Sequence, residues 1–129
     1  MNQETILISG ASSGIGEACA RIFARAGRKL ILLARRKERL DVLSNELKQL
    51  GAEVYTASFD IRDRAQVEAF AKELPEAFRS IRVLVNNAGL AAGLEPIQDG
   101  NTDDWDRMID TNVKGLLYLS KAIIPRMKD

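Results

Sequence analysis

The stretch ILISGASSGIG, Ile6 to Gly16, joins a short apolar run to a loop that holds three glycines. The run stops at Gly10, and from Ile15 onward apolar residues recur at a spacing typical of a helix. The stretch therefore predicts a strand, a tight turn and a helix, in that order. A turn in this position suits an anion, because the free N–H groups at the start of a helix attract negative charge.

The three glycines of this loop, Gly10, Gly14 and Gly16, have the spacing G-x-x-x-G-x-G. One can allow the sharp turn, another a close approach of a pyrophosphate, and the third tight packing of the helix on the sheet. Ser12 and Ser13 add hydroxyl donors. The alternative is an ordinary glycine-rich turn without a ligand, but the position between strand and helix favours nucleotide binding.

The rest of the chain repeats this alternation. Further short apolar runs occupy residues 30–33, 54–59 and 81–85, and helical periodicity separates them. Strands that are apolar on both faces are typical of a parallel sheet covered by helices on both sides. The sequence therefore predicts a doubly wound α/β fold with right-handed crossovers.

The helices also carry specific predictions. Asp63 is expected to cap the helix after the third strand, and Thr102 the last helix, which we expect to bend near Asn112. Residues 90–101 have no clear periodicity and are predicted to form a loop. The residues expected on apolar faces are Ile15, Cys19, Ile22, Phe23 and Ala26 in the first helix, and Trp105, Ile109, Val113, Leu116 and Leu117 in the last.

Composition narrows the class of protein. The chain has 129 residues, which suits one domain, and its net charge of +1 gives no reason to expect a nucleic acid partner. It has no histidine and a single cysteine, Cys19, so neither the commonest general base nor a structural zinc site is expected. No apolar run reaches membrane-spanning length, and the cysteine usage fits a reducing compartment. We therefore expect a single cytoplasmic domain over residues 1–129, without metal or membrane partner.

The sequence LILLARRKERL, residues 30–40, bears on the choice of dinucleotide. At the end of the second strand, an acidic residue binds the ribose 2′-hydroxyl of NAD, whereas an arginine accommodates the 2′-phosphate of NADP. Ala34 stands in the acidic position, and Arg35 and Arg36 follow it. The alternative is a solvated basic start to the next helix, but cations there oppose the helix dipole. The sequence therefore favours NADP (NADPH) over NAD.

Four ordered motifs together resemble the short-chain dehydrogenases/reductases. They are the run from Ser9 to Gly16, the pair Asp60-Ile61 after the third strand, the run Asn86-Asn87-Ala88-Gly89, and Asn112. The resemblance covers residues 5–127, and from Asn86 onward the chain is similar to the branch that oxidises serine, allo-threonine and related 3-hydroxy acids with NADP. It implies a Rossmann-like three-layer αβα sandwich, here truncated to about four parallel strands in the order 3-2-1-4.

The resemblance implies a role for each matching residue. Asn87 would tie neighbouring strands together, and Asn112 would be catalytic by holding a water in the family's proton relay. The alternative for Asn112 is a polar residue that bends its helix. The implied cofactor-binding residues are Gly10, Ser12, Ser13, Gly14, Ile15 and Gly16 at the pyrophosphate, Arg35 and Arg36 at the 2′-phosphate, Asp60 and Ile61 at the adenine, Asn86 beside the adenosine, and Ala88 and Gly89 beneath the nicotinamide ribose.

The family's catalytic serine, tyrosine and lysine would follow the helix that carries Asn112. The nearest imitation is YLSK, Tyr118 to Lys121, but its spacing is three rather than four. We therefore predict that Tyr118 packs and that Lys121 is a surface charge. The chain resembles a cofactor-binding half, which a truncated fragment, a half that pairs with a complementary half, or an incomplete gene product would each explain.

Two hypotheses for function follow. The first is the NADP(H)-binding half of an oxidoreductase, inactive alone, whose substrates would include 3-hydroxy acids. The second is a non-catalytic module on a flavodoxin-like or half-Rossmann scaffold, which self-associates or pairs with a complementary C-terminal half. An uncovered edge of the fourth strand, with Val83 and Val85, predicts a homo-oligomer, because unpaired strand edges attract other chains.

Overall fold

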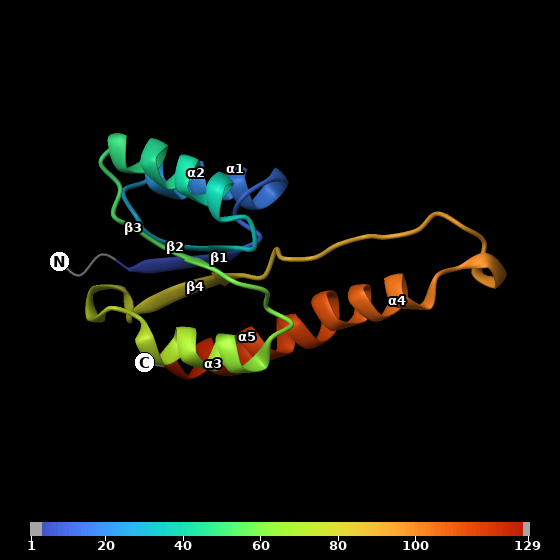
Figure 1. Ribbon diagram of the computed structural model, residues 1–129. Coiled ribbons are helices and arrows are strands. Elements are labelled where there is room, and N and C mark those ends of the chain that lie inside the picture. Colours follow the sequence, from blue (N-terminus) through green and yellow to red (C-terminus); the bar gives the residue numbers. More distant parts are fainter. Residues whose placement is uncertain (1–3, 128–129) are drawn as a thin grey trace.

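The computed structural model describes residues 4–127, which form a sheet with helices on both faces (Figure 1). Its four strands are parallel and lie in the order β3-β2-β1-β4, which confirms the predicted fold class and strand order. The elements are β1 (Thr5–Ser9), α1 (Gly14–Arg25), β2 (Lys29–Ala34), α2 (Lys37–Gln49), β3 (Val54–Ser58), α3 (Arg64–Glu73), the 3₁₀ turn η1 (Glu76–Phe78), β4 (Ile81–Val85), the 3₁₀ turn η2 (Ile97–Asp99), α4 (Thr102–Ile109), the π-helical turn η3 (Asp110–Gly115), α5 (Leu116–Ile123) and the 3₁₀ turn η4 (Ile124–Arg126).

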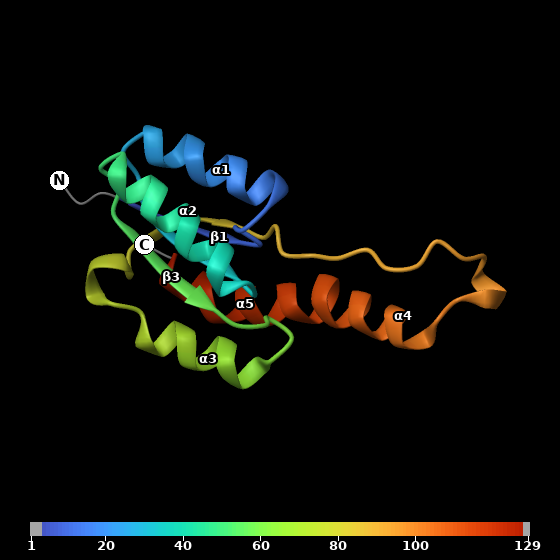
Figure 2. The same ribbon diagram turned by 45° about the horizontal axis from the view of Figure 1, so that its top comes forward.

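The sheet is the middle layer of three. Side chains alternate along a strand, so Ile6 and Ile8 of β1 pack on the α1–α2 side, whereas Leu7 packs on the α3–α5 side. β2 repeats the pattern in register, with Leu30 opposite Ile6 and Ile31 opposite Leu7. Figure 2 shows α1 and α2 together over one face, with α3 and α5 across the other. Both faces of the central strands are therefore buried, as their apolar sequences predict.

The face that α1 packs on the sheet differs from the predicted one. Ile15 and Ile22 are 73% and 62% exposed, whereas Gly16, Ala20 and Ala24 are buried. Small residues occupy the contact because α1 approaches closely: a Cβ on Gly16 would lie 2.3 Å from the carbonyl oxygen of Gly10. The prediction of an inward apolar face was therefore wrong for the two isoleucines and for Ala26, which is also exposed, and right for Cys19 and Phe23, which pack against the core.

The ends of the later helices follow capping chemistry. Asp63 caps α3 as predicted, because its Oδ1 accepts from the backbone N–H of Gln66 at 3.2 Å. The cap of α4 is Asn101 rather than Thr102, since Asn101 Oδ1 accepts from the N–H of Asp103 at 2.8 Å. Thr102 is the first helical residue instead. The predicted position was therefore wrong by one residue, because an asparagine can serve the same capping function as a threonine.

Residues 90–109, which we call the arm, project from the sheet and its helices (Figure 1). An extended segment runs outward from β4, and α4 returns toward the sheet and continues through η3 into α5. Leu94 and Ile97 are 102% and 82% exposed. The apolar face predicted for the last helix is only partly covered: Trp105 lies against Gly100 and is 38% exposed, whereas Ile109, Val113 and Leu117 are more than half exposed.

Two further predictions concern α5 and the helices in general. Tyr118 packs against the core on the α3–α5 side, and Lys121 is exposed, which confirms both expectations. No helix within residues 4–127 is both long enough and apolar enough to span a membrane.

Candidate functional site

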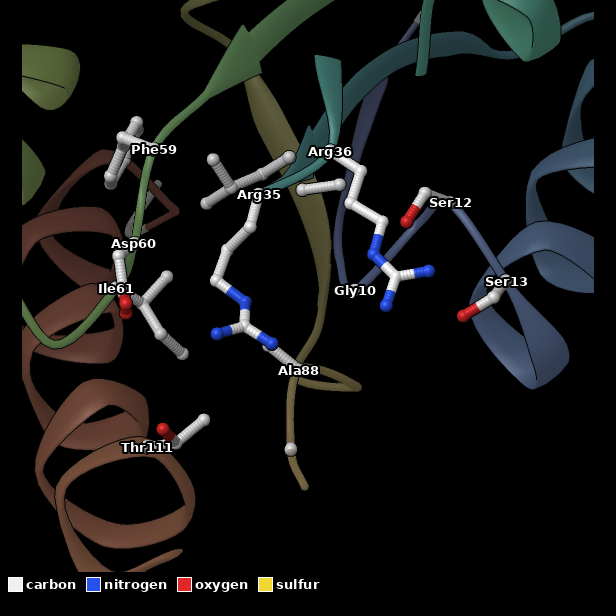
Figure 3. A pocket seen from close by; sticks show the side chains of 13 residues that line it. Gly10, Ser12, Ser13, Arg35, Arg36, Phe59, Asp60, Ile61, Ala88 and Thr111 are labelled. Carbon is white, nitrogen blue, oxygen red and sulfur yellow. The ribbon is translucent and has the colours of Figure 1, made fainter. Parts of the chain in front are cut away.

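A cavity lies where the carboxyl ends of the parallel strands meet (Figure 3). Ligands of open α/β sheets bind at this edge, in the crevice outside the strand ends. The loops after all four strands contribute to the lining, and η3 adds one residue. The lining residues are Gly10, Ser12, Ser13, Leu33, Ala34, Arg35, Arg36, Phe59, Asp60, Ile61, Ala88, Gly89 and Thr111.

Most of the predicted site residues come together in this lining, and a few do not. The lining includes four residues that were not among the proposed site residues: Leu33, Ala34, Phe59 and Thr111. Phe59 and Thr111 directly precede predicted site residues along the chain, which is the only local signal for them. The predicted residues outside the lining are Gly14, Ile15, Gly16, Asn86 and Asn112.

The glycine loop is held against the segment that follows β4. Gly10 has a φ of +63°, and a Cβ there would lie 2.9 Å from the Cα of Ala88. Asn87 Nδ2 donates to the Gly10 carbonyl at 3.0 Å, and Ser9 Oγ accepts from the N–H groups of Asn87 and Ala88 at 3.1 Å each. These bonds confirm Asn87 as a tie between the ends of β1 and β4.

The start of α1 offers hydrogen-bond donors to an anion. Ser13 is the N-cap residue, and within residues 4–127 its side chain makes no capping bond. The first N–H groups of a helix have no partner inside the helix, so an anion can satisfy them. Ser12 and Ser13 both line the cavity, which places their hydroxyls beside this helix start.

Arg35 and Arg36 bring positive charge to the cavity from the end of β2. In Figure 3, Arg36 extends toward Ser12 and Ser13, which lie on one side of the cavity. Arg35 projects into the space between them and the opposite side, where Asp60 and Ile61 lie. Both arginines are exposed, and neither forms an ion pair with another residue of the described part of the chain. Two unpaired guanidinium groups favour a ligand with phosphate groups, because guanidinium can donate two hydrogen bonds to one phosphate.

Asp60 faces the same cavity but carries negative charge. Burial would raise the pKa of its carboxyl, yet the hydrogen bonds from Arg62 outweigh this and hold the pKa below the usual value for aspartate. The Arg62 guanidinium lies 2.7 Å from Asp60 Oδ2. Asp60 is therefore an ionised hydrogen-bond acceptor, suited to a ligand group that donates.

The two predicted asparagines outside the lining make other contacts. Asn86 Nδ2 donates to Ser120 Oγ at 3.1 Å, which ties the end of β4 to α5. Asn112 donates through Nδ2 to the Leu90 carbonyl and accepts at Oδ1 from the Leu90 N–H, both at 2.9 Å. Asn112 thus fastens the start of the arm to η3. The π-helical geometry of η3 confirms that the last helix departs from regular α-helix near this residue.

The fold is that of a doubly wound α/β protein, and the cavity at its strand ends is suited to an anionic ligand by its two guanidinium groups and its helix start. The chain belongs to the short chain dehydrogenase family, whose model matches residues 4–129. The site alone would not have separated this family from other proteins with the same architecture.

Individual relatives resemble the chain over nearly its whole length. It is 51% identical over 124 residues to sulfoacetaldehyde reductase 2 of Chromohalobacter salexigens, covering 96% of this chain and 49% of the relative. It is 49% identical over 122 residues to the NADP-dependent 3-hydroxy acid dehydrogenase YdfG of Salmonella typhi, covering 95% and 48%. A solved closed form of serine dehydrogenase complexed with NADP+ superposes with a TM-score of 0.89 at 45% identity, covering 95% and 48%. The chain thus spans about half the length of the curated relatives it matches.

Proposed function

We propose that this chain is the NADP(H)-binding part of a short-chain dehydrogenase/reductase that transfers hydride between NADP and a hydroxyl or carbonyl substrate. The observation that carries the proposal is the single cavity that joins the glycine loop, Arg35, Arg36 and Asp60. The names of the relatives support NADP as the dinucleotide. We further propose that residues 1–129 form one dinucleotide-binding domain of a cytoplasmic protein.

We assign each part of NADP to residues of the cavity or to residues close to it along the chain. Ser12, Ser13 and the start of α1 would hold the pyrophosphate, and Arg35 with Arg36 would hold the 2′-phosphate. When bound, the oxidised cofactor accepts a hydride and the reduced cofactor donates one. The remaining assignments are Asp60 and Ile61 at the adenine, Ala88 and Gly89 beneath the nicotinamide ribose, Gly14, Ile15 and Gly16 in the shape of the loop, and Asn86 beside the adenosine.

The substrate and the proton chemistry form the finer part of the proposal. A 3-hydroxy acid such as serine or allo-threonine is proposed because relatives carry that activity in their names. Asn112 is proposed to hold a water of the proton relay, with its carboxamide oriented by Leu90. Neither Tyr55 nor Tyr118 has a lysine four residues later. We therefore expect residues 1–129 alone to bind cofactor without turning over substrate.

A second candidate is a module that associates with itself or with a complementary C-terminal half. The partly exposed apolar residues from Trp105 to Leu117 favour it, together with the outer edge of β4, which pairs only with β1 among residues 4–127. Apolar side chains and an open strand edge both gain stability from a partner. Sedimentation over a dilution series tests this candidate, and a compact monomer at every concentration contradicts it.

Titration with NADPH and NADH, followed by nicotinamide fluorescence, tests the cofactor assignment. NADPH is expected to bind more tightly than NADH. Arg35→Asp should weaken NADPH binding much more than NADH binding, because only NADPH carries the 2′-phosphate. Arg25→Asp, at the end of α1 and outside the cavity, is the matched control and should change neither affinity. Equal losses for both dinucleotides in the Arg35 variant would contradict the proposal.

A further inference from the structure

Arg62 holds Asp60 without lining the cavity itself. Its guanidinium donates to Asp60 Oδ2 from Nε at 2.9 Å and from Nη2 at 2.7 Å, and its backbone N–H donates to Oδ1 at 3.0 Å. A carboxylate can accept about four hydrogen bonds, so these three leave about one acceptor position, on Oδ1. The orientation of Asp60 and the position of its free lone pair are thereby fixed.

The loop that carries Asp60 has hydrogen bonds that do not involve the Arg62 guanidinium. The turn has its own backbone hydrogen bond, from the Asp63 N–H to the Asp60 carbonyl at 2.9 Å, and Asp63 caps α3 independently. The contacts of the Arg62 side chain are instead concentrated on the carboxylate that faces the cavity. This points to a role in presenting Asp60 to a ligand.

The pair also matters for charge. A carboxylate in a cavity that receives a polyanion opposes binding, and Arg35 and Arg36 would have to overcome that opposition. Arg62 places a positive charge against Asp60 from outside the lining, which offsets its field close to the phosphate-binding arginines. Asp60 can therefore accept a hydrogen bond from a ligand and still weaken the attraction of the two arginines for phosphate less than an unpaired carboxylate would.

We propose that Arg62 is a positioning residue that aims the free acceptor of Asp60 at the exocyclic amino group of adenine, and so sets a preference for a 6-amino over a 6-oxo purine. The inference rests on the proposed function, since it takes the cavity to bind an adenine dinucleotide. In hypoxanthine a carbonyl oxygen replaces the amino group. That oxygen would face the carboxylate with no hydrogen between them, which is unfavourable.

The test compares the affinities of the chain for NADPH and for reduced nicotinamide hypoxanthine dinucleotide phosphate, by fluorescence titration. The wild type is expected to bind NADPH about tenfold or more tightly than the analogue, because a hydrogen bond to a charged acceptor is worth about this much. Arg62→Met should lower this ratio about threefold or more, and Arg62→Lys should give an intermediate ratio, since lysine keeps the charge but not the planar fork. Arg64→Met, at an exposed arginine that begins α3 and has no hydrogen bond to Asp60 among residues 4–127, should leave the ratio unchanged.

The outcomes separate this inference from the function on which it rests. If Arg62→Met lowers both affinities by the same factor, Arg62 has only a structural role and the inference is wrong. A wild-type ratio near one, with NADPH binding that still depends on Arg35, also overturns the inference but leaves the proposed function intact. If the wild type binds neither ligand, the proposed function itself fails. Thermal melting of each variant confirms that the compared proteins are folded.

Discussion

The sheet and the arm follow the same sequence rules and end in opposite environments. In β1 and β2 the apolar residues are fully buried, because helices cover both faces of the sheet. In the arm, Leu94 and Ile97 are almost wholly exposed, and the apolar face of α4 is only partly covered among residues 4–127. Periodicity therefore predicts which residues share a face, whereas burial depends on a second layer that the pattern itself does not supply.

The variant expected to destabilise the sheet region most is Gly16→Ala. The new Cβ would lie 2.3 Å from the Gly10 carbonyl oxygen and 2.6 Å from Asn87 Nδ2, which hold each other in place. The free energy of unfolding, measured in urea, should fall by about 3 kcal/mol or more. Gly14→Ala is the control: nothing lies within 4 Å there, and only its φ of +57° opposes a side chain, at about 1–2 kcal/mol. Equal losses at the two glycines would contradict the close approach of α1.

A pair of leucine truncations measures the two regions directly. Leu32→Ala removes a fully buried side chain from β2 and should lower the free energy of unfolding by about 3 kcal/mol. Leu94→Ala removes a fully exposed one from the arm and should change it by less than about 0.5 kcal/mol. Both values come from equilibrium unfolding in urea. A large loss at Leu94 would show that the arm is covered in solution.

The junction between the two regions is tested by Asn112→Ala. The variant loses both hydrogen bonds to Leu90, which should weaken the local attachment of the arm by about 1–2 kcal/mol. Hydrogen exchange should show lower protection of the Leu90 amide, with little change at amides of β1. Equal loss of protection at both places would mean that Asn112 supports the whole domain rather than the arm.

Thr111→Val is expected to give a small effect of the opposite sign, a gain in stability. The Thr111 hydroxyl is buried and has no hydrogen-bond partner among residues 4–127. Valine has nearly the same shape without the polar group, so the ligand-free chain should gain about 1 kcal/mol. Thermal melting detects the gain, and Thr111→Ser, which keeps the hydroxyl and loses the methyl, should show none. A loss of stability in Thr111→Val would reveal a partner for the hydroxyl.

Much of the fold could be predicted from sequence because buried parallel strands appear as continuous apolar runs. The prediction failed for the sheet-facing side of α1, where close approach selects Gly16 and Ala20 over the larger Ile15. The sizes of the side chains on a helix do not reveal how closely the helix approaches the element on which it packs. The sequence alone could not show how closely α1 would approach the Gly10 loop.

The candidate site also has a part that the sequence predicts and a part that it does not. The loops after the strands could be assigned to one place, because the carboxyl ends of parallel strands meet at one edge of the sheet. Thr111 could not be assigned to the cavity from the sequence, since it lies there because η3 packs beside Ile61. The bonds of Arg62 to Asp60 also depend on the shape of the loop after β3. Site residues that directly follow a strand can therefore be predicted from the sequence, whereas those that tertiary packing brings to the cavity cannot.

The bond between Asn87 and Gly10 has an electrostatic consequence for the glycine loop. A backbone carbonyl oxygen carries partial negative charge and repels an anion, whereas a backbone N–H attracts it, so the oxygens of a loop suited to anions need other partners. The Gly10 oxygen accepts from Asn87 Nδ2 and lies against the first turn of α1 at Gly16. Its partial negative charge is neutralised by the carboxamide and by the positive end of the helix dipole. Asn87, which does not line the cavity, thus makes the potential beside the glycine loop less negative.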